Sequence, residues 1–165
     1  MPAEPSLAHP KILTLPGLLS ALAEAGKKRV VFTNGCFDLL HPGHVDLLAR
    51  CRAQGDLLVL GLNSDASVSR QGKSPPRPIV PFAERAFVLA HLAAVDYIVG
   101  FEEDTPLELV LAIRPQVLIK GGDWAVADIA GGAEVEADGG RVLSLPLLGD
   151  FSTSGIIFRI EHILK

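Results

Sequence analysis

The sequence predicts an α/β fold, in which a doubly wound parallel sheet of about five strands has helices on both faces. Short apolar runs alternate along most of the chain with amphipathic segments of helical length. The apolar runs are nearly continuous in Val, Ile and Leu, as in LLVLGLN at Leu57–Asn63, and this is typical of strands buried on both faces. With 165 residues the chain is long enough for one such core, so we expect a single domain, 1–165.

The predicted strands are the apolar runs that turn signals bound on both sides. RVVFT at 29–33 is the first of them, and each later run is preceded by a polar or glycine-containing segment. We expect the strands at 29–33, Leu57–Asn63, Tyr97–Phe101, 117–120 and Arg141–Leu145. The core of the domain is therefore expected from about residue 28, after an N-terminal extension, 1–27, that carries one short helix.

Start and stop signals define the predicted helices. Gly26 suits a left-handed cap after the first helix, Pro81 opens the third, and Pro115 ends the fourth. Ser152 or Thr153 caps the last helix. We expect the helices at Leu15–Ala25, 43–54, from Pro81 onward with an apolar stripe of Phe82, Ala86, Leu89 and Leu92, and at 105–113, 128–137 and 152–164.

Composition excludes several classes of protein. The net charge is −4 and the pI about 5.7, so the chain lacks the basic field that binding of nucleic acid requires. No apolar run approaches the roughly 20 residues that cross a bilayer. Cys36 and Cys51 form neither a disulfide scaffold nor a zinc module, and two thiols fit a cytoplasmic location. A mean hydropathy of +0.35 favours self-association.

Polar and glycine-rich loops follow three of the predicted strands. They read NGCFDLLHPGH at 34–44, NSD at 63–65 and GGDW at 121–124. Because parallel strands end at the same edge of a sheet, these loops should converge. The sequence therefore predicts one binding site at this edge.

The first loop matches neither the G-x-G-x-x-G dinucleotide fingerprint nor the phosphate-binding P-loop, but it contains His41-x-Gly43-His44 where a helix should begin. At this spacing both imidazoles lie on one side of the first turn. Free amides at a helix N-terminus favour phosphate, and Gly43 lets a phosphate approach the backbone. Two histidines there can stabilise the charge that develops during phosphoryl transfer.

Other interpretations of these residues stay open. The two histidines could be loop residues satisfied by carbonyls or, at a spacing that is unusual for zinc, a metal pair. Asp38 could cap the turn or orient a ligand, and Cys36 could be a small residue facing the core. Ser152-Thr153-Ser154 could form an anion site or provide a simple N-cap.

The loop 33–44 (TNGCFDLLHPGH) resembles the G-x-F-D-x-x-H-x-G-H signature of the cytidylyltransferase-like nucleotidyltransferases, which have a Rossmann-like fold. The similarity extends from about residue 28 to the C-terminus. NSDAS, AVDYIV, FEEDTP and IKGGDW, at 63–67, 94–99, 101–106 and 119–124, are most similar to the heptose 1-phosphate adenylyltransferases. The resemblance implies transfer of AMP from ATP to D-glycero-β-D-manno-heptose 1-phosphate with Mg²⁺ present, in the synthesis of ADP-heptose for lipopolysaccharide core.

The resemblance also implies roles for individual residues. His41 and His44 would hold the phosphates of ATP, and Lys73, Arg77 and Arg85 supply positive charge near the Pro-rich loop 71–81. The catalytic residues are expected to be His41, His44, Lys73 and Arg85. The nucleotide-binding residues are expected to be Asn34, Gly35, Cys36, Phe37, Asp38, Gly43, Asn63, Asp65, Lys120, Gly122, Asp123, Ser152, Thr153 and Ser154. None of these is expected to be a metal ligand.

Two rival functions remain at the level of sequence. One is a cytidylyltransferase that acts on glycerol 3-phosphate or another phosphorylated alcohol, and the other is a non-catalytic module that senses a nucleotide. The resemblance implies small-molecule substrates, a homodimer and no nucleic-acid or membrane partner. Related domains are commonly fused behind a sugar-kinase domain. A chain of 165 residues is too short to carry one, so this chain is expected to be the free-standing form.

Overall fold

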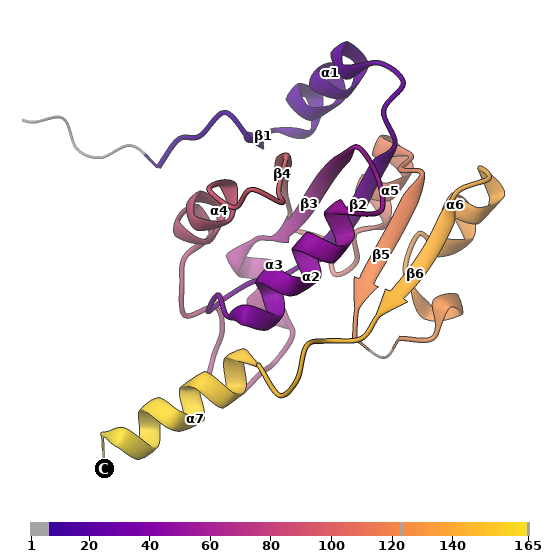
Figure 1. The fold of residues 1–165 in the computed structure, drawn as a ribbon. Helices are drawn as coiled ribbons and strands as arrows, with labels where there is room; N and C mark the ends of the chain where they lie inside the picture. The colour runs from indigo at the N-terminus through magenta and orange to yellow at the C-terminus, as the bar shows by residue number, and fades with distance from the viewer. Residues whose placement is uncertain (1–6, 123, 165) are drawn as a thin grey trace, which may run out of the picture.

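The computed structural model describes residues 7–122 and 124–164, and it contains a six-stranded sheet in which every pair of neighbours is parallel (Figure 1). The strand order is β1-β4-β3-β2-β5-β6. The strands are β1 (Ile12–Leu13), β2 (Val30–Gly35), β3 (Leu57–Asn63), β4 (Tyr97–Phe101), β5 (Val117–Gly121) and β6 (Arg141–Leu145). The predicted α/β class and parallel sheet are confirmed.

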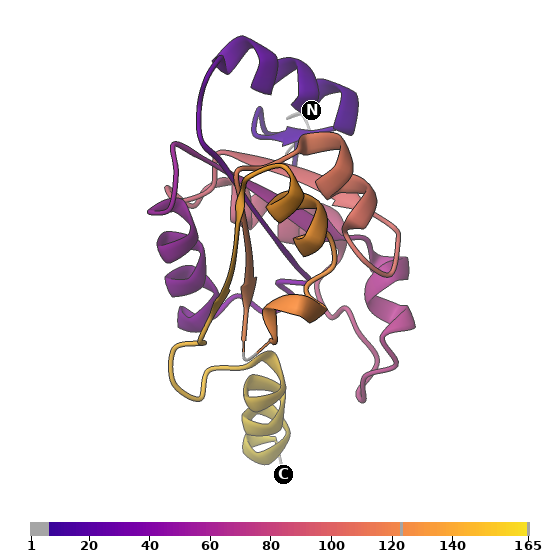
Figure 2. The ribbon, with the colours of Figure 1, turned by 90° about the vertical axis from the view of Figure 1, so that its right-hand side faces the viewer.

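Helices pack on both faces of this sheet, as expected. They are α1 (Leu15–Ala25), α2 (Pro42–Arg52), α3 (Asp65–Arg70), α4 (Phe82–Ala90), α5 (Leu107–Ile113), α6 (Gly132–Ala137) and α7 (Thr153–Ile163), with a 3₁₀ turn η1 (Val126–Asp128). One apolar cluster joins α2 and α4 to the sheet, and a second joins α1, α5 and α6 to its other face. In the turned view α2 and α6 accordingly lie on opposite sides (Figure 2).

Alternation along each strand explains the two clusters. Val31 packs into the α2/α4 cluster, whereas its neighbours Val30 and Phe32 pack into the other one. In β3, Leu60 and Val59 divide in the same way. Because successive side chains of a strand point to opposite faces, a run without polar residues fills both layers.

Two elements were not predicted. The sixth strand, β1, has two residues and pairs with the edge strand β4 through Ile12–Ile98 and Leu13–Val99. Two residues are too few to show the alternation of apolar and polar side chains that predicts a strand, so the sequence does not indicate β1. Helix α3 follows β3 directly, where the Ser64 hydroxyl accepts a hydrogen bond from the Ser67 amide and caps the first turn.

The segment 128–137 is not the single helix that we expected. It divides into η1 and α6, and Gly131 between them has a φ of 86°. A Cβ at Gly131 would lie 2.7 Å from Val110, so both the backbone conformation and the packing require glycine there. The other predicted elements are present, and their ends shift by one to two residues.

The order of the strands determines where a ligand can bind. From β2 the chain proceeds through β3 and β4 on one side and then returns to place β5 and β6 on the other. The carboxyl ends of β2 and β5 therefore form the switch point at which open α/β sheets bind ligands. Helix α7 lies beyond this edge and projects away from the sheet (Figures 1 and 2). In the described ranges, no helix has the length and apolar character needed to span a membrane.

Candidate active site

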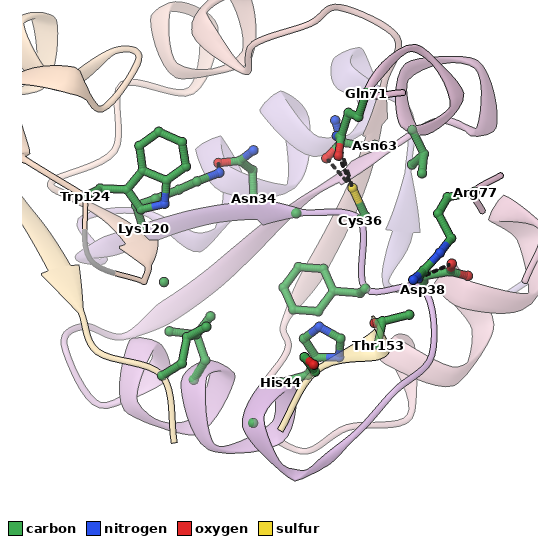
Figure 3. Close-up of a pocket in the computed structure, with 18 of the residues that line it drawn as sticks. Asn34, Cys36, Asp38, His44, Asn63, Gln71, Arg77, Lys120, Trp124 and Thr153 are labelled. Atoms are coloured by element: carbon green, nitrogen blue, oxygen red, sulfur yellow. Dashed lines mark hydrogen bonds and ion pairs between the residues drawn. The ribbon is translucent and has the colours of Figure 1, made fainter. Parts of the chain in front are cut away.

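A cavity of about 630 Å³ opens at the carboxyl edge of the sheet, where the predicted loops converge. Most of the expected site residues line it. They are His41, His44, Lys73, Asn34, Gly35, Cys36, Phe37, Asp38, Gly43, Asn63, Lys120, Ser152, Thr153 and Ser154. In Figure 3 Lys120 and Trp124 lie at one end of the cavity, Arg77 and Asp38 at the other, and His44 between them beside Thr153.

His41 and His44 stack on each other at the start of α2. Their ring centroids are 3.7 Å apart with an interplanar angle of 19°. His41 is the N-cap residue in extended conformation, and Pro42 takes the first helical position, where its missing N–H costs nothing. The Nδ1 atoms of both imidazoles are buried and find no hydrogen-bond partner in the described part of the chain. Since buried polar groups are normally paired, the missing partners of these atoms indicate that a ligand could bind here.

Burial keeps both imidazoles neutral near pH 7. It lowers the pKa of His44 from its ordinary 6.5 to about 4, and the neighbouring His41 lowers it further while Asp38 acts in the opposite direction. Burial also lowers the pKa of His41. Both histidines are therefore neutral in the free protein near pH 7, and an anionic ligand would favour their protonated forms.

The loop before α2 brings its backbone close to the cavity. Phe37 has a φ of 46°, which is unusual for a residue with a side chain, and its ring packs 5.0 Å from that of His44. A Cβ on Gly35 would lie 2.8 Å from the Phe37 ring, so glycine is required there. A Cβ on Gly43 would lie 3.3 Å from the Cβ of Phe151, which shows how closely the segment before α7 approaches α2.

Asp38 lines the cavity, but its carboxylate is directed to the protein itself. It accepts hydrogen bonds from the amides of Ile79 and Val80 at 2.8–2.9 Å and pairs with Arg77 at 3.4 Å. The side chain is 4% exposed. We expected Asp38 to bind the nucleotide; in the structure it fastens the Pro-rich segment 71–81 to the first loop.

Arg85 and Asp65 require a correction, because neither lines the cavity. The guanidinium of Arg85 is fully buried and donates to the carbonyls of Val80, Cys36 and Asn63. It also pairs with Asp65 at 2.6 Å. All these bonds are internal, so Arg85 braces the ends of β2 and β3 from behind the site and is not placed to contact a phosphate.

A further expected residue, Gly122, does not line the cavity. Gly122, with a φ of 111°, donates its amide to Leu145 and accepts from the Ser144 hydroxyl, so it connects β5 to β6. Asp123 lies outside the described residues. The neighbouring Gly121 lines the cavity instead.

The N-terminus of α7 forms one wall. The Ser152 hydroxyl caps this helix by accepting from the Gly155 amide at 3.0 Å. Thr153 and Ser154 also face the cavity. The helix cap needs only one of the three hydroxyl groups, so capping explains Ser152 but does not explain Thr153 and Ser154.

Lys120 supplies positive charge at the opposite end. Its Nζ lies 3.3 Å from Asn34 Oδ1 and 5.6 Å from the centre of the Trp124 ring. Burial lowers the pKa of Lys120, the Cys36 side chain raises it and Lys73 lowers it. No carboxylate pairs with this ammonium among the described contacts, so a bound anion would stabilise its charged form.

Several lining residues were missed by the sequence analysis. One of them is Gln71, whose amide contacts the Cys36 thiol at 3.2 Å. The other missed residues are Leu47, Val68, Asp104, Thr105, Pro106, Gly121, Trp124, Asp128, Ile129, Ala130, Leu147 and Phe151. Trp124 and the FEEDTP residues could have been found from the sequence, since they belong to the motifs IKGGDW and FEEDTP. The apolar lining residues could not, because nothing in the sequence distinguishes them from residues of the hydrophobic core.

The arrangement suits a phosphorylated ligand. It combines two helix N-termini, two histidines with unpartnered nitrogens, and the side chains of Lys73 and Lys120. In the described residues, no three His, Cys, Asp or Glu side chains gather as a metal site. The geometry is that of a cavity with positive charge and free helix amides in its wall.

Comparison with known proteins agrees with this geometry. Residues 32–137 match the family model described as cytidylyltransferase-like. The bifunctional protein HldE of Pelobacter propionicus is 53% identical over 146 residues, and that of Geobacter sulfurreducens is 52% identical over 151 residues. These matches cover 87% and 92% of this chain but 30% of each relative, so the chain spans less than a third of their length.

Solved structures share the fold at low identity. A lipopolysaccharide core biosynthesis protein from Thermoplasma volcanium aligns with a TM-score of 0.61 and 24% identity, over 73% of this chain and 97% of its own. Pantothenate synthetase from Thermus thermophilus aligns with a TM-score of 0.59 and 18% identity, over 84% of this chain and 62% of its own. The fold is therefore one that nucleotidyltransferase-like proteins share.

Proposed function

Because this chain belongs to the cytidylyltransferase-like family of nucleotidyltransferases, we propose that it transfers AMP from ATP to D-glycero-β-D-manno-heptose 1-phosphate. The products are ADP-D-glycero-β-D-manno-heptose and pyrophosphate. The observation that carries the proposal is the stacked pair His41 and His44, whose buried Nδ1 atoms have no partner in the described chain.

The proposed reaction is a direct displacement at phosphorus. An oxygen of the sugar phosphate attacks the α-phosphorus of ATP and forms the new P–O bond. The bond from that phosphorus to the α,β-bridging oxygen breaks, and its electron pair leaves with pyrophosphate. No proton transfer or covalent enzyme intermediate is needed, so the protein contributes position and charge stabilisation.

The residues around the cavity divide this work. His41, His44 and the amides at the start of α2 bind the phosphoryl oxygens and stabilise the charge that grows in the five-coordinate transition state. The N-terminus of α7, with Thr153 and Ser154, binds the triphosphate from the other side. Lys120 lies at the end of the cavity where the nucleoside or the sugar phosphate is bound.

Mg²⁺ belongs to the proposal as a companion of the nucleotide. The carboxylate of Asp38 is engaged by two amides and Arg77, and the described chain gathers no three metal-binding side chains. This donor set fits an ion that the triphosphate and water hold, which is how Mg²⁺ is often bound. When bound with the nucleotide, Mg²⁺ would supply positive charge that offsets the charge of the pyrophosphate group.

The choice of heptose 1-phosphate rests on similarity. NSDAS, AVDYIV, FEEDTP and IKGGDW resemble the adenylyltransferases that act on this sugar, and the matched relatives are bifunctional proteins of about 50% identity. Asp104 and Thr105 of FEEDTP line the cavity, where they can accept hydrogen bonds from sugar hydroxyls. The proposal also includes a homodimer and a cytoplasmic location, and light scattering of the purified chain tests the former.

Pyrophosphate release tests the proposed substrates. The chain is assayed with ATP, CTP or GTP, each with Mg²⁺ and either heptose 1-phosphate or glycerol 3-phosphate. We expect release with ATP and heptose 1-phosphate only. Release with CTP and glycerol 3-phosphate would keep the phosphate chemistry and overturn the substrates, and no release with any pair would overturn the proposed reaction.

A further inference from the structure

Arg77 lies in the Pro-rich segment 71–81, and neither the expected site residues nor the proposed reaction uses it. Its side chain is 5% exposed, although the residues around it in this segment are mostly at the surface. It lines the cavity beside Asp38 and the first turn of α7 (Figure 3). A buried guanidinium normally makes close charge-assisted hydrogen bonds, so its contacts decide what it does there.

The contacts of Arg77 are long and incomplete. Its two terminal nitrogens lie 3.4 Å from Asp38 Oδ2 and 3.4 Å from Ser154 Oγ. Its Nε is buried and has no hydrogen-bond partner in the described part of the chain. A paired arginine and carboxylate usually approach to about 2.7–2.9 Å, so this guanidinium is held loosely.

Asp38 does not depend on Arg77 for its hydrogen bonds. It accepts from the amides of Ile79 and Val80 at 2.8–2.9 Å, which are shorter contacts than that to Arg77. The internal ion pair therefore leaves much of the donor capacity of Arg77 unused. A buried N–H without a partner destabilises the protein, and a ligand that accepts a hydrogen bond from it removes that cost.

The surroundings define the missing acceptor as an anion with several oxygens. Ser154 belongs to the first turn of α7, whose N-terminus favours negative charge. The unpartnered nitrogens of His41 and His44 belong to the same cavity. Lys120 is engaged at the other end with Asn34 and Trp124, whereas Arg77 donates to Ser154 in the first turn of α7.

We propose that Arg77 binds the triphosphate of the nucleotide at the N-terminus of α7, donating from Nε and a terminal nitrogen to phosphate oxygens. The inference rests on the proposed function for the identity of the anion as a nucleotide triphosphate. In binding it, Arg77 connects the segment 71–81, the loop of Asp38 and the start of α7 to the substrate. The three segments are thereby ordered together when nucleotide binds.

The side-chain Nε–H signal of Arg77 provides a test in the unaltered protein. The ¹⁵N-labelled chain is titrated with inorganic tripolyphosphate, and Arg77→Lys identifies the signal by removing it. We expect this signal to move downfield and to become protected from exchange with water. An Nε–H signal that does not respond while tripolyphosphate binds elsewhere would overturn the proposal.

Affinity measurements give a second test. Calorimetric titration with tripolyphosphate should show at least about tenfold weaker binding for Arg77→Gln, the loss expected for charged hydrogen bonds. Arg77→Lys keeps the charge and should recover part of the affinity. Arg114→Gln is the control, because it removes the same charge at a remote, exposed pair with Asp138. Unchanged affinity in folded Arg77→Gln would reduce Arg77 to a structural partner of Asp38.

The two proposals fail in different ways. If Arg77 responds to tripolyphosphate but heptose 1-phosphate supports no pyrophosphate release, the substrate assignment fails and the role of Arg77 stands. If turnover is normal while Arg77 neither shifts nor affects affinity, the role of Arg77 fails and the function stands.

Discussion

His41 and His44 differ from the other histidines of the described chain in having buried Nδ1 atoms without partners. His91 and His162, by comparison, each contact a backbone carbonyl through Nδ1 at 2.7–2.8 Å. A buried polar nitrogen is retained at a cost to folding, and such costs are typical of groups that wait for a ligand. At the scale of the residue, the missing hydrogen-bond partners of these two buried nitrogens therefore distinguish the candidate site.

We expect His41→Gln and His44→Gln to lower kcat by about 100- to 1000-fold each, because they remove donors that act on transition-state charge. The dissociation constant for ATP should rise much less, since the backbone amides and α7 remain. Steady-state kinetics and calorimetry measure the two effects. His162→Gln is the control, as His162 lies on the exposed side of α7. Equal losses in rate and affinity would contradict a role specific to the transition state.

The lowered pKa of His44 predicts how stability depends on pH. The unfolded chain binds this proton with a pKa near 6.5, whereas the folded chain binds it only at about 4. The unfolded state therefore binds more protons between these values, and the free energy of unfolding decreases as pH falls through that window.

The contribution of His44 is at most about 3 kcal/mol, since one pKa unit corresponds to about 1.4 kcal/mol. Urea unfolding of the unaltered chain and of His44→Gln at pH 7 and pH 4.5 measures it. We expect a smaller loss of stability on acidification in the variant. The same loss in both proteins would show that His44 titrates normally when folded.

At the scale of the element, the site depends on how a few buried groups hold the strand ends together. Arg85 on α4 reaches the carbonyls of Cys36 after β2 and Asn63 at the end of β3, and it pairs with Asp65 at the start of α3. Asp38 performs a similar task for the segment that precedes α4. These two residues keep the loops in place, so that His41 and His44 can be presented from α2.

Arg85→Met should destabilise the fold by about 3–5 kcal/mol, because three carbonyls and one carboxylate lose a buried charged partner. Arg85→Lys should destabilise it less, since an ammonium retains part of the bonding. Denaturant unfolding measures both, with Arg114→Gln as an exposed control expected to leave the stability nearly unchanged. A stable Arg85→Lys variant that fails to bind ATP would return Arg85 to the role of a phosphate ligand.

At the scale of the whole molecule, one parallel sheet supports two apolar layers. Leu60 belongs to the layer under α2 and α4, and Leu118 to the layer under α1, α5 and α6. Both side chains are at most 1% exposed. Because alternate residues of the same strands fill the two layers, neither layer can be lost without the other.

Leu60→Ala and Leu118→Ala should each lower the free energy of unfolding by about 2–5 kcal/mol, as expected for buried leucines. Each variant should still unfold in a single transition. Leu111→Ala serves as the control, because Leu111 is 47% exposed and its removal should cost less than about 0.5 kcal/mol. Two separate transitions, followed by fluorescence and circular dichroism, would show that the layers fold independently.

The sequence alone determined the class of fold, most of the elements and the edge of the sheet at which the loops form a cavity. Strand runs that are apolar at every position require cover on both faces, and the loop 34–44 carries its own local chemistry, so these features need no knowledge of distant contacts. For the same reason His41 and His44 were identified before their geometry was known, and α2 begins where Pro42 and Gly43 predict it.

Only the tertiary structure decided which charged residues face the cavity. Arg85 and Asp65 resembled site residues by type and position, but contacts with strand ends far along the chain turn Arg85 inward, and Asp65 pairs with it. Arg77 showed the reverse, since burial against Asp38 and α7 gives a residue of an ordinary loop its place in the cavity. The sequence shows directly which side chains are charged. Where such a side chain points depends on its packing against residues that are distant in the sequence.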